Sequence, residues 1–305
     1  MIVAGDLTVG ALVAITMFGA RALSPVQITF LALQQLGASR EAAQRFDSLL
    51  KLKIDHNAEK APAVFRPFKG AIRMRDIAYR FPNADDFAIR GVTAEIEPGQ
   101  VIGIVGSNGS GKSTLLKMIL GLYRPMSGQI LLDSANMAQI HSPELRATIA
   151  FAGSKHEFFY GTIEQNMKLG CPTATIAQIE AVCEELDIDL DGPLFPKRLE
   201  TRYSAQEFGA MSGPMRQKLC LARAFVKDAP VTLLDEPDAV LDASGAAAFA
   251  RVIERRRGAK TIVMTLNDRR HLAICDKLLV LNAGKLVRFD DAKTILGEIA
   301  AQQAK

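Results

Sequence analysis

The stretch QVIGIVGSNGSGKSTLLKMILGLY, residues 100–123, decides the fold of this chain. It carries the spacing of a phosphate-binding loop, Gly106-x4-Gly111-Lys112-Ser113. A strand is predicted before the loop, from Val101 to Val105, and a helix after it, from Ser113 to about Leu122. Glycines let the backbone fold into a concavity of N–H donors, and the helix dipole adds positive potential for phosphate. Because the flanking strand and helix are both indicated, a chance glycine-rich turn is the weaker interpretation.

The side chains of this loop predict a nucleoside triphosphate and Mg²⁺ as ligands. Lys112 would reach the β- and γ-phosphates, and the Ser113 hydroxyl would ligate the metal. The loop residues predicted to bind the nucleotide are Gly106, Ser107, Asn108, Gly109, Ser110, Gly111, Lys112, Ser113 and Thr114.

A second motif, PVTLLDEPDAVLD at residues 230–242, supplies the carboxylates that such a site needs. Val231 to Leu234 is predicted to be a buried strand, and Asp235 at its end could hold Mg²⁺ through water. Glu236 follows directly, where it is well placed to orient or deprotonate an attacking water. A surface acid is the alternative interpretation of Glu236.

The N-terminal region predicts a membrane helix. An apolar run from Leu7 to Ala20 continues after Arg21 to Leu33, long enough together to span a bilayer. A charge such as Arg21 at mid-membrane costs roughly 2.5–3.5 kcal/mol, and Pro25 would kink the helix, so protein or water should lie beside it. A buried helix of a soluble domain is the alternative. A secretory signal fits less well, because the leader carries Asp6 and no basic segment.

The flank after this run gives the helix an orientation. Basic residues exceed acidic ones there: Arg40, Arg45, Lys51 and Lys53 against Glu41 and Asp47. That excess places the C-terminal side of the helix in the cytoplasm.

The composition is that of a folded protein and excludes some classes of function. Of the 305 residues, 49% are apolar and 23% charged, an ordinary globular balance. The net charge of +4 is too mild and scattered to predict a nucleic-acid partner. The four cysteines lie far apart without a CxxC pair, so neither a disulfide framework nor a zinc site is indicated.

Together, the phosphate loop, MSGPMRQ (residues 211–217) and LLDEPDAVLD (residues 233–242) resemble the ATP-binding cassette of ABC transporters. The resemblance covers roughly residues 70–290. It implies an α/β P-loop NTPase fold, with a RecA-like core and a helical subdomain at about 155–228, and ATP with Mg²⁺ as cofactors. The domains expected are a partial transmembrane domain at 1–54, a linker at 55–69 and the cassette at 70–305.

The stretch LTVGALVAITMFGARALSP, residues 7–25, resembles the last transmembrane helix of ABC exporters, most closely those of type I protein secretion. Such exporters carry several helices per half and this chain shows one, so a fragment or one part of a split half-transporter is expected. The resemblance implies an inner (plasma) membrane location with a cytoplasmic cassette. Its implied partners are the missing helices, a secreted polypeptide cargo and a second cassette, identical or different.

Carried over by position, the resemblance implies further site residues. Phe81 would stack on adenine, with Tyr79 as the alternative. Ser154 stands where a glutamine is usual and is too short to reach a metal or water from there. Asn267 stands where a histidine is usual and cannot offer an imidazolium to the γ-phosphate, and His271 lies off target. The predicted catalytic set is therefore Glu236, Asn267 and Ser154.

The signature MSGPMRQ, compared with the usual LSGGQRQ, is altered where the partner's nucleotide would bind. Ser212 and Gly213 are kept and are predicted to contact the γ-phosphate, but Pro214 has no N–H and Met215 replaces a glutamine. Proline suits the first turn of a helix, so the helix should still form. Two functions follow: an exporter ATPase with slow turnover, or a degenerate cassette that binds ATP as a regulatory or structural partner. A soluble ATPase outside transport and a truncated remnant are further alternatives.

Overall fold

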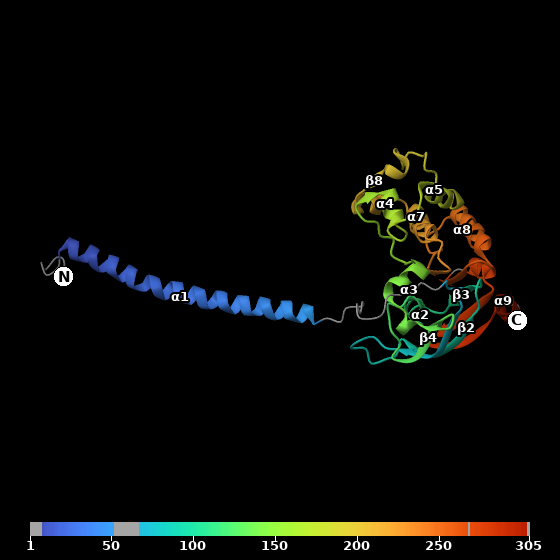
Figure 1. The fold of residues 1–305 in the computed structure, drawn as a ribbon, viewed down its shortest axis with the longest axis horizontal. Helices are drawn as coiled ribbons and strands as arrows, with labels where there is room; N and C mark the ends of the chain where they lie inside the picture. Colours follow the sequence, from blue (N-terminus) through green and yellow to red (C-terminus); the bar gives the residue numbers. More distant parts are fainter. Residues whose placement is uncertain (1–7, 52–66, 268, 304–305) are drawn as a thin grey trace. The chain divides into compact units, whose positions relative to one another are not determined.

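The chain divides into two compact units, Met1–Asn57 and Ala58–Lys305 (Figure 1). The computed structural model describes residues 8–51, 67–267 and 269–303. Most of the linker predicted at 55–69 lies outside the described residues, as do Asp6, Leu7 and Lys53. The domain boundaries at 54 and 70 therefore stay predictions.

One helix, α1 (Val9–Leu50), makes up the described part of the first unit. It continues through Pro25 without interruption, and the Thr29 hydroxyl donates to the Pro25 carbonyl at 2.8 Å. Its 42 residues extend about 63 Å, more than the roughly 30 Å hydrocarbon core of a bilayer. None of its residues is buried. Within the described parts of the chain, α1 alone is long and apolar enough to cross a membrane.

Six strands form the central sheet of the second unit, in the order β12-β11-β3-β10-β9-β6. Their bounds are β3 (Val101–Val105), β6 (Ile149–Ala152), β9 (Val231–Asp235), β10 (Thr261–Thr265), β11 (Lys277–Asn282) and β12 (Lys285–Asp291). All pair in parallel except β12, which is antiparallel to β11. Because parallel strands share the edge at which they end, the residues that follow β3, β6, β9 and β10 come to one edge of the sheet.

A smaller antiparallel sheet has the order β2-β1-β4-β5. Its strands are β1 (Ile72–Tyr79), β2 (Ile89–Ile96), β4 (Ser127–Leu132) and β5 (Ala135–Asn136). Apolar side chains of both sheets and of α2 (Lys112–Ile119) form one buried cluster, so α2 is held rigidly behind the phosphate loop. The helix ends before the predicted Leu122 because Gly121 takes a left-handed φ of 81° just beyond it.

Helices gather on the other side of the second unit, where Figure 1 shows α4, α5 and α7 together. The elements that fall within the helical subdomain predicted at about 155–228 are β7 (Gly161–Thr162), α4 (Ile163–Lys168), α5 (Ile176–Glu185), η2 (Arg198–Glu200), β8 (Arg202–Tyr203), α6 (Ala205–Ala210) and α7 (Gly213–Val226). The remaining helices are η1 (Met137–Gln139), α3 (Ser142–Thr148), α8 (Ala243–Arg256), η3 (Arg269–Ile274) and α9 (Ala292–Gln303).

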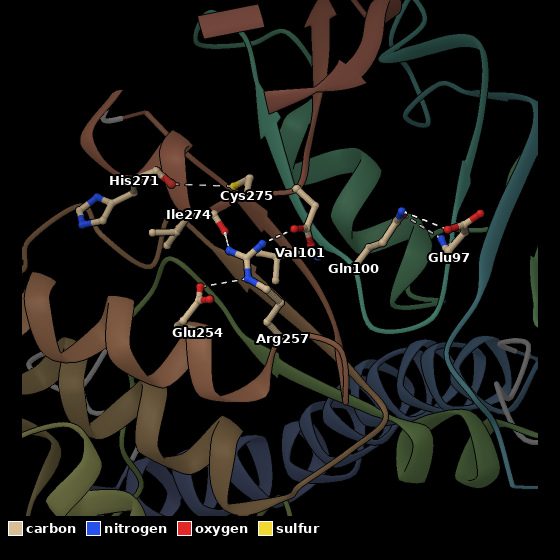
Figure 2. Close-up of polar contacts among 9 residues, drawn as sticks. Glu97, Gln100, Val101, Glu254, Arg257, His271, Ile274 and Cys275 are labelled. Atoms are coloured by element: carbon tan, nitrogen blue, oxygen red, sulfur yellow. Dashed lines mark hydrogen bonds and ion pairs between the residues drawn. The ribbon is translucent and has the colours of Figure 1, made fainter. Parts of the chain in front are cut away.

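Arg257, directly after α8, ties this helix to the sheet (Figure 2). Its guanidinium donates to Glu254 at 3.0 Å and also to the Ile274 carbonyl and the Asp276 carboxylate. Asp276 in turn accepts from the Val101 backbone N–H at 2.7 Å, at the start of β3. The network fixes the strand that leads into the phosphate loop.

Candidate nucleotide site

Glycines shape the loop between β3 and α2. Gly109 and Gly111 have φ values of 79° and 100°, in the left-handed region that other residues rarely adopt. A Cβ on Gly111 would lie 2.6 Å from the Ala88 carbonyl oxygen, and one on Gly106 would lie 2.5 Å from Ser110 Oγ. The loop therefore depends on glycine for its tight turn at the start of α2, a shape that suits phosphate oxygens.

Lys112 is buried and bends back over the loop. Its Nζ donates to the carbonyl oxygens of Gly106 at 2.7 Å and Ser107 at 3.1 Å. In the same loop, Ser110 Oγ is buried and has no hydrogen-bond partner in the part of the chain that the structure describes. A buried ammonium and an unsatisfied hydroxyl on one loop form a set of donors that fits an anion.

Two oxygen groups meet where the loop faces the end of β9. Ser113 Oγ donates to Asp235 Oδ1 at 2.8 Å, and Asp235 is only 2% exposed. Mg²⁺ prefers oxygen ligands and keeps several waters, so one or two protein ligands beside phosphate are enough. No group of three or more His, Cys, Asp or Glu side chains among the described residues could hold a metal by itself. The pair thus fits a metal that is shared between protein and phosphate.

Glu236 is held from two sides. Its backbone N–H donates to Thr265 Oγ1 at 2.7 Å, and one of its carboxylate oxygens accepts from Asn267 Nδ2 at 3.1 Å. Thr265 Oγ1 also donates to Asp235 Oδ1 at 2.9 Å. The predicted residue Asn267 therefore contacts the predicted base directly. Thr265 was not predicted from the sequence; its signal there is a hydroxyl residue that ends an apolar strand two positions before Asn267.

His271, which the sequence placed off target, contacts a different carboxylate. Its ring is buried, and Nδ1 lies 2.9 Å from Asp238 Oδ2. This pair joins η3 to the segment that follows Glu236.

A cavity of about 480 Å³ connects the loop with an aromatic ring. It is lined by Phe81, Ala88, Asn108, Gly109, Gly111, Lys112, Ser113, Thr114 and Glu236. Phe81 is 38% exposed, and its ring contacts Tyr79 and Tyr123 edge to face, with centroids 5.2 and 5.5 Å away. Tyr79 and Tyr123 stack on each other, so they support Phe81 rather than line the cavity. Tyr123 was not anticipated from the sequence.

Eight predicted residues do not line this cavity. Gly106, Ser107 and Ser110 belong to the loop itself, and Asp235 and Asn267 hydrogen-bond to the lining residues Ser113 and Glu236. The other three, Ser154, Ser212 and Gly213, lie elsewhere. Ser154 lines a second cavity of about 630 Å³, which it shares with Asp235. Ser212 and Gly213 lie at the start of α7, where Ser212 Oγ caps the helix by accepting from the Met215 N–H at 3.4 Å. Pro214 lies in the first turn, and Met215 packs against the hydrophobic core. The helix forms as predicted, and Ser212 and Gly213 do not line the cavity at the phosphate loop.

A glycine loop between a parallel strand and a helix, with a buried lysine and an acidic pair at the end of β9, which β10 separates from β3, defines a P-loop nucleotide-binding protein. Residues 89–239 match the family model described as ABC transporter. The chain thus contains an ATP-binding cassette of the ABC transporter family, preceded by one long apolar helix.

Curated relatives match most of the chain. An ATP-dependent lipid A-core flippase of Xanthomonas oryzae pv. oryzae is 33% identical over 248 residues, 81% of this chain and 41% of its own length. One from Bordetella avium is 29% identical over 288 residues, 93% of this chain and 48% of its own. The glutathione/L-cysteine transport system ATP-binding/permease protein CydC of Escherichia coli is 28% identical over 298 residues, 93% of this chain and 49% of its own.

A solved structure titled as a bacterial Atm1-family ABC exporter with ATP bound superposes with a TM-score of 0.79. It is 23% identical and covers 98% of this chain and 53% of its own, so it shows a shared fold. The chain spans less than half the length of the three curated relatives named above.

Proposed function

We propose that this chain is the ATP-binding and ATP-hydrolysing component of an ABC-type membrane exporter. One observation carries the proposal: Lys112, Ser113 and Glu236 line one cavity, with Asp235 hydrogen-bonded to Ser113 behind it. This is the arrangement that hydrolysis of a nucleoside triphosphate requires.

The side chains have separate tasks in this proposal. Lys112 exchanges its two loop carbonyls for phosphate oxygens, which bind an ammonium more strongly because they are charged. Ser113 and Asp235 hold Mg²⁺, which when bound neutralises charge on the phosphates. Glu236 orients the attacking water and accepts its proton at a carboxylate oxygen. Phe81 offers a partly exposed ring for the adenine.

A second cassette, identical or different, is part of the proposal. Ser212 and Gly213 lie outside the cavity of their own chain, so we infer that they contact the γ-phosphate bound by a partner chain. Pro214 removes one N–H donor from that contact. Within the chain's own site, Ser154 is too short to reach the metal or the attacking water, and Asn267 offers no charged donor to the γ-phosphate. We expect these departures to slow hydrolysis by roughly 10²–10⁴.

A degenerate cassette with little turnover is the second candidate. The altered residues Ser154, Pro214 and Asn267 favour it, because binding a nucleotide needs fewer donors than the transition state does. The hydrogen bond from Asn267 to Glu236 favours the hydrolysing cassette instead, because it holds the base beside the phosphate loop.

We also propose that α1 is a transmembrane helix and that the chain works in the inner membrane with a cytoplasmic cassette. The proposed domains are 1–54 in and beside the membrane, the linker at 55–69 and the cassette at 70–305. Further transmembrane helices would have to come from outside this sequence. Polypeptide cargo of the type I secretion kind stays a prediction from the N-terminal resemblance alone. The relatives are named for lipid A-core and for glutathione and L-cysteine, and no polypeptide cargo is among these.

The test compares three forms of the full chain in detergent: wild type, Lys112→Ala and Glu236→Gln. We expect Lys112→Ala to abolish ATP binding, and Glu236→Gln to bind ATP but lose turnover. Lys293→Ala is the control, because Lys293 is an exposed lysine of α9 that lines neither of the two cavities. Unchanged nucleotide affinity in Lys112→Ala would refute the site. Equal turnover in wild type and Glu236→Gln would favour the degenerate cassette.

A further inference from the structure

Thr265 ends β10 with its side chain fully buried between two functional carboxylate residues. Strand β10 pairs with β9 so that Thr265 lies directly opposite Asp235. The ladder register therefore fixes the threonine hydroxyl within reach of the Asp235 carboxylate. The O–O distance is 2.9 Å.

The direction of the two hydrogen bonds at Thr265 is determined by their partners. The Glu236 backbone N–H can only donate, and it does so to Thr265 Oγ1 at 2.7 Å. The hydroxyl has one proton, which it donates to Asp235 Oδ1. The same oxygen atom of Asp235 also accepts from Ser113 Oγ at 2.8 Å. Two donors on one oxygen fix the orientation of this carboxylate.

The backbone of Glu236 needs such a support. Its φ is 52°, in the left-handed region that residues with a side chain seldom occupy unless the surroundings hold them there. The bond from its N–H to Thr265 is one of the contacts that hold it. Through this bond, the direction in which the Glu236 side chain leaves the strand end depends on Thr265.

We propose that Thr265 is a positioning residue that couples the metal-binding carboxylate of Asp235 to the placement of Glu236, an inference that rests on the proposed ATP hydrolysis. Any change in the position of the Asp235 carboxylate would reach the backbone of Glu236 through this one hydroxyl. Thr265 does not line the cavity at the phosphate loop. Its contribution is to the geometry of Asp235 and Glu236.

Thr265→Val removes the hydroxyl and keeps the shape, while Thr265→Ser keeps the hydroxyl. Thr261→Val is a matched control at the other end of the same strand. Thr261 is equally buried, and its Oγ1 likewise donates once, to the Gly70 carbonyl at 2.8 Å, and accepts once, from the Gly99 N–H at 3.0 Å. Both valine variants lose the same kind of bonds, so their loss of thermal stability should be similar.

Two quantities are measured on the full chain in detergent. The first is the gain in ATP affinity that Mg²⁺ gives over EDTA, and the second is the single-turnover rate of hydrolysis. We expect Thr265→Val to lose most of the Mg²⁺ gain and to lower the rate by roughly tenfold or more. Thr265→Ser and Thr261→Val should keep both near wild type. If Thr265→Val does not fold, Thr265→Ala replaces it with the same expectation.

Wild-type values of both quantities in Thr265→Val would overturn the proposal. Equal losses in Thr261→Val would also overturn it, since the effect would then be one of general stability. A different result would contradict the proposed function: the wild-type chain would then hydrolyse ATP no faster than Glu236→Gln. The Mg²⁺ gain in affinity would still report on Thr265 in that case, because it needs no hydrolysis.

Discussion

Asn267 and Pro214 stand where cassettes of this family usually have histidine and glycine, and a mutation can restore either residue. The Asn267 amide donates to Glu236 at 3.1 Å but carries no charge, whereas an imidazolium could also reach a phosphate. Pro214 lies in the first turn of α7 and offers no N–H to a partner's nucleotide.

We predict that Asn267→His together with Pro214→Gly raises the ATPase rate at least about tenfold, because a lost charge-assisted hydrogen bond costs about 1.5–3 kcal/mol. Steady-state phosphate release from the full chain measures the effect. The same pair of changes on a Glu236→Gln background is the control and should stay inactive. Fast turnover by the unmodified chain, lost on Glu236→Gln, would mean that the two departures matter little.

Side chains that belong to a local motif could be predicted, and those that meet through the sheet could not. The glycine loop, Lys112 and Ser113 are contiguous, and the structure places Asp235 and Glu236 beside them. Thr265 reaches the same site only because β10 pairs with β9 in one particular register. A sequence shows that a strand ends in threonine, but it does not show which residue lies opposite.

For helices and strands too, the bounds set by a local motif could be predicted, and those that depend on packing could not. Strand β3 has the predicted bounds of Val101–Val105, since an apolar run before a glycine loop defines both ends. The helix after the loop ends at Ile119 rather than near Leu122, because the conformation of Gly121 depends on the packing around it. Helix α7 forms in spite of Pro214, as expected for a proline in the first turn.

The packing of helices α5 and α7 predicts how the cysteines react. Burial raises the pKa of the Cys183 thiol in α5 to about 12 and that of Cys220 in α7 to about 11, and it raises that of Cys275, after η3, to about 12. A raised thiol pKa lowers the fraction of reactive thiolate near neutral pH. We therefore expect iodoacetamide to label the partly exposed Cys171 first in the native protein.

Peptide mapping by mass spectrometry identifies the labelled cysteine. All four should react in denaturant, where burial no longer holds the pKa values up. Rapid native labelling of Cys183 or Cys220 would show that the helical part of the cassette opens readily.

The predicted site residues of one chain do not all line the same cavity among the residues that the structure describes. Part of the phosphate loop lines one cavity with Glu236; Ser154 and Asp235 line another, and Ser212 with Gly213 lie at the start of α7. In the proposed pairing of two cassettes, nucleotide binding and association are one linked process, so we expect ATP to stabilise the pair.

The long apolar helix gives the last prediction, which concerns where the full chain resides. Helix α1 buries no residue, and its apolar stretch exceeds what a bilayer crossing needs, while Arg21 costs only roughly 2.5–3.5 kcal/mol in the membrane. The basic residues Arg40 and Arg45 favour a cytoplasmic C-terminal side. We expect the full chain to sediment with membranes and to resist alkaline extraction, whereas residues 67–305 alone, which carry their own core, should stay in the supernatant. If the full chain remains in the supernatant without detergent, α1 does not cross a membrane.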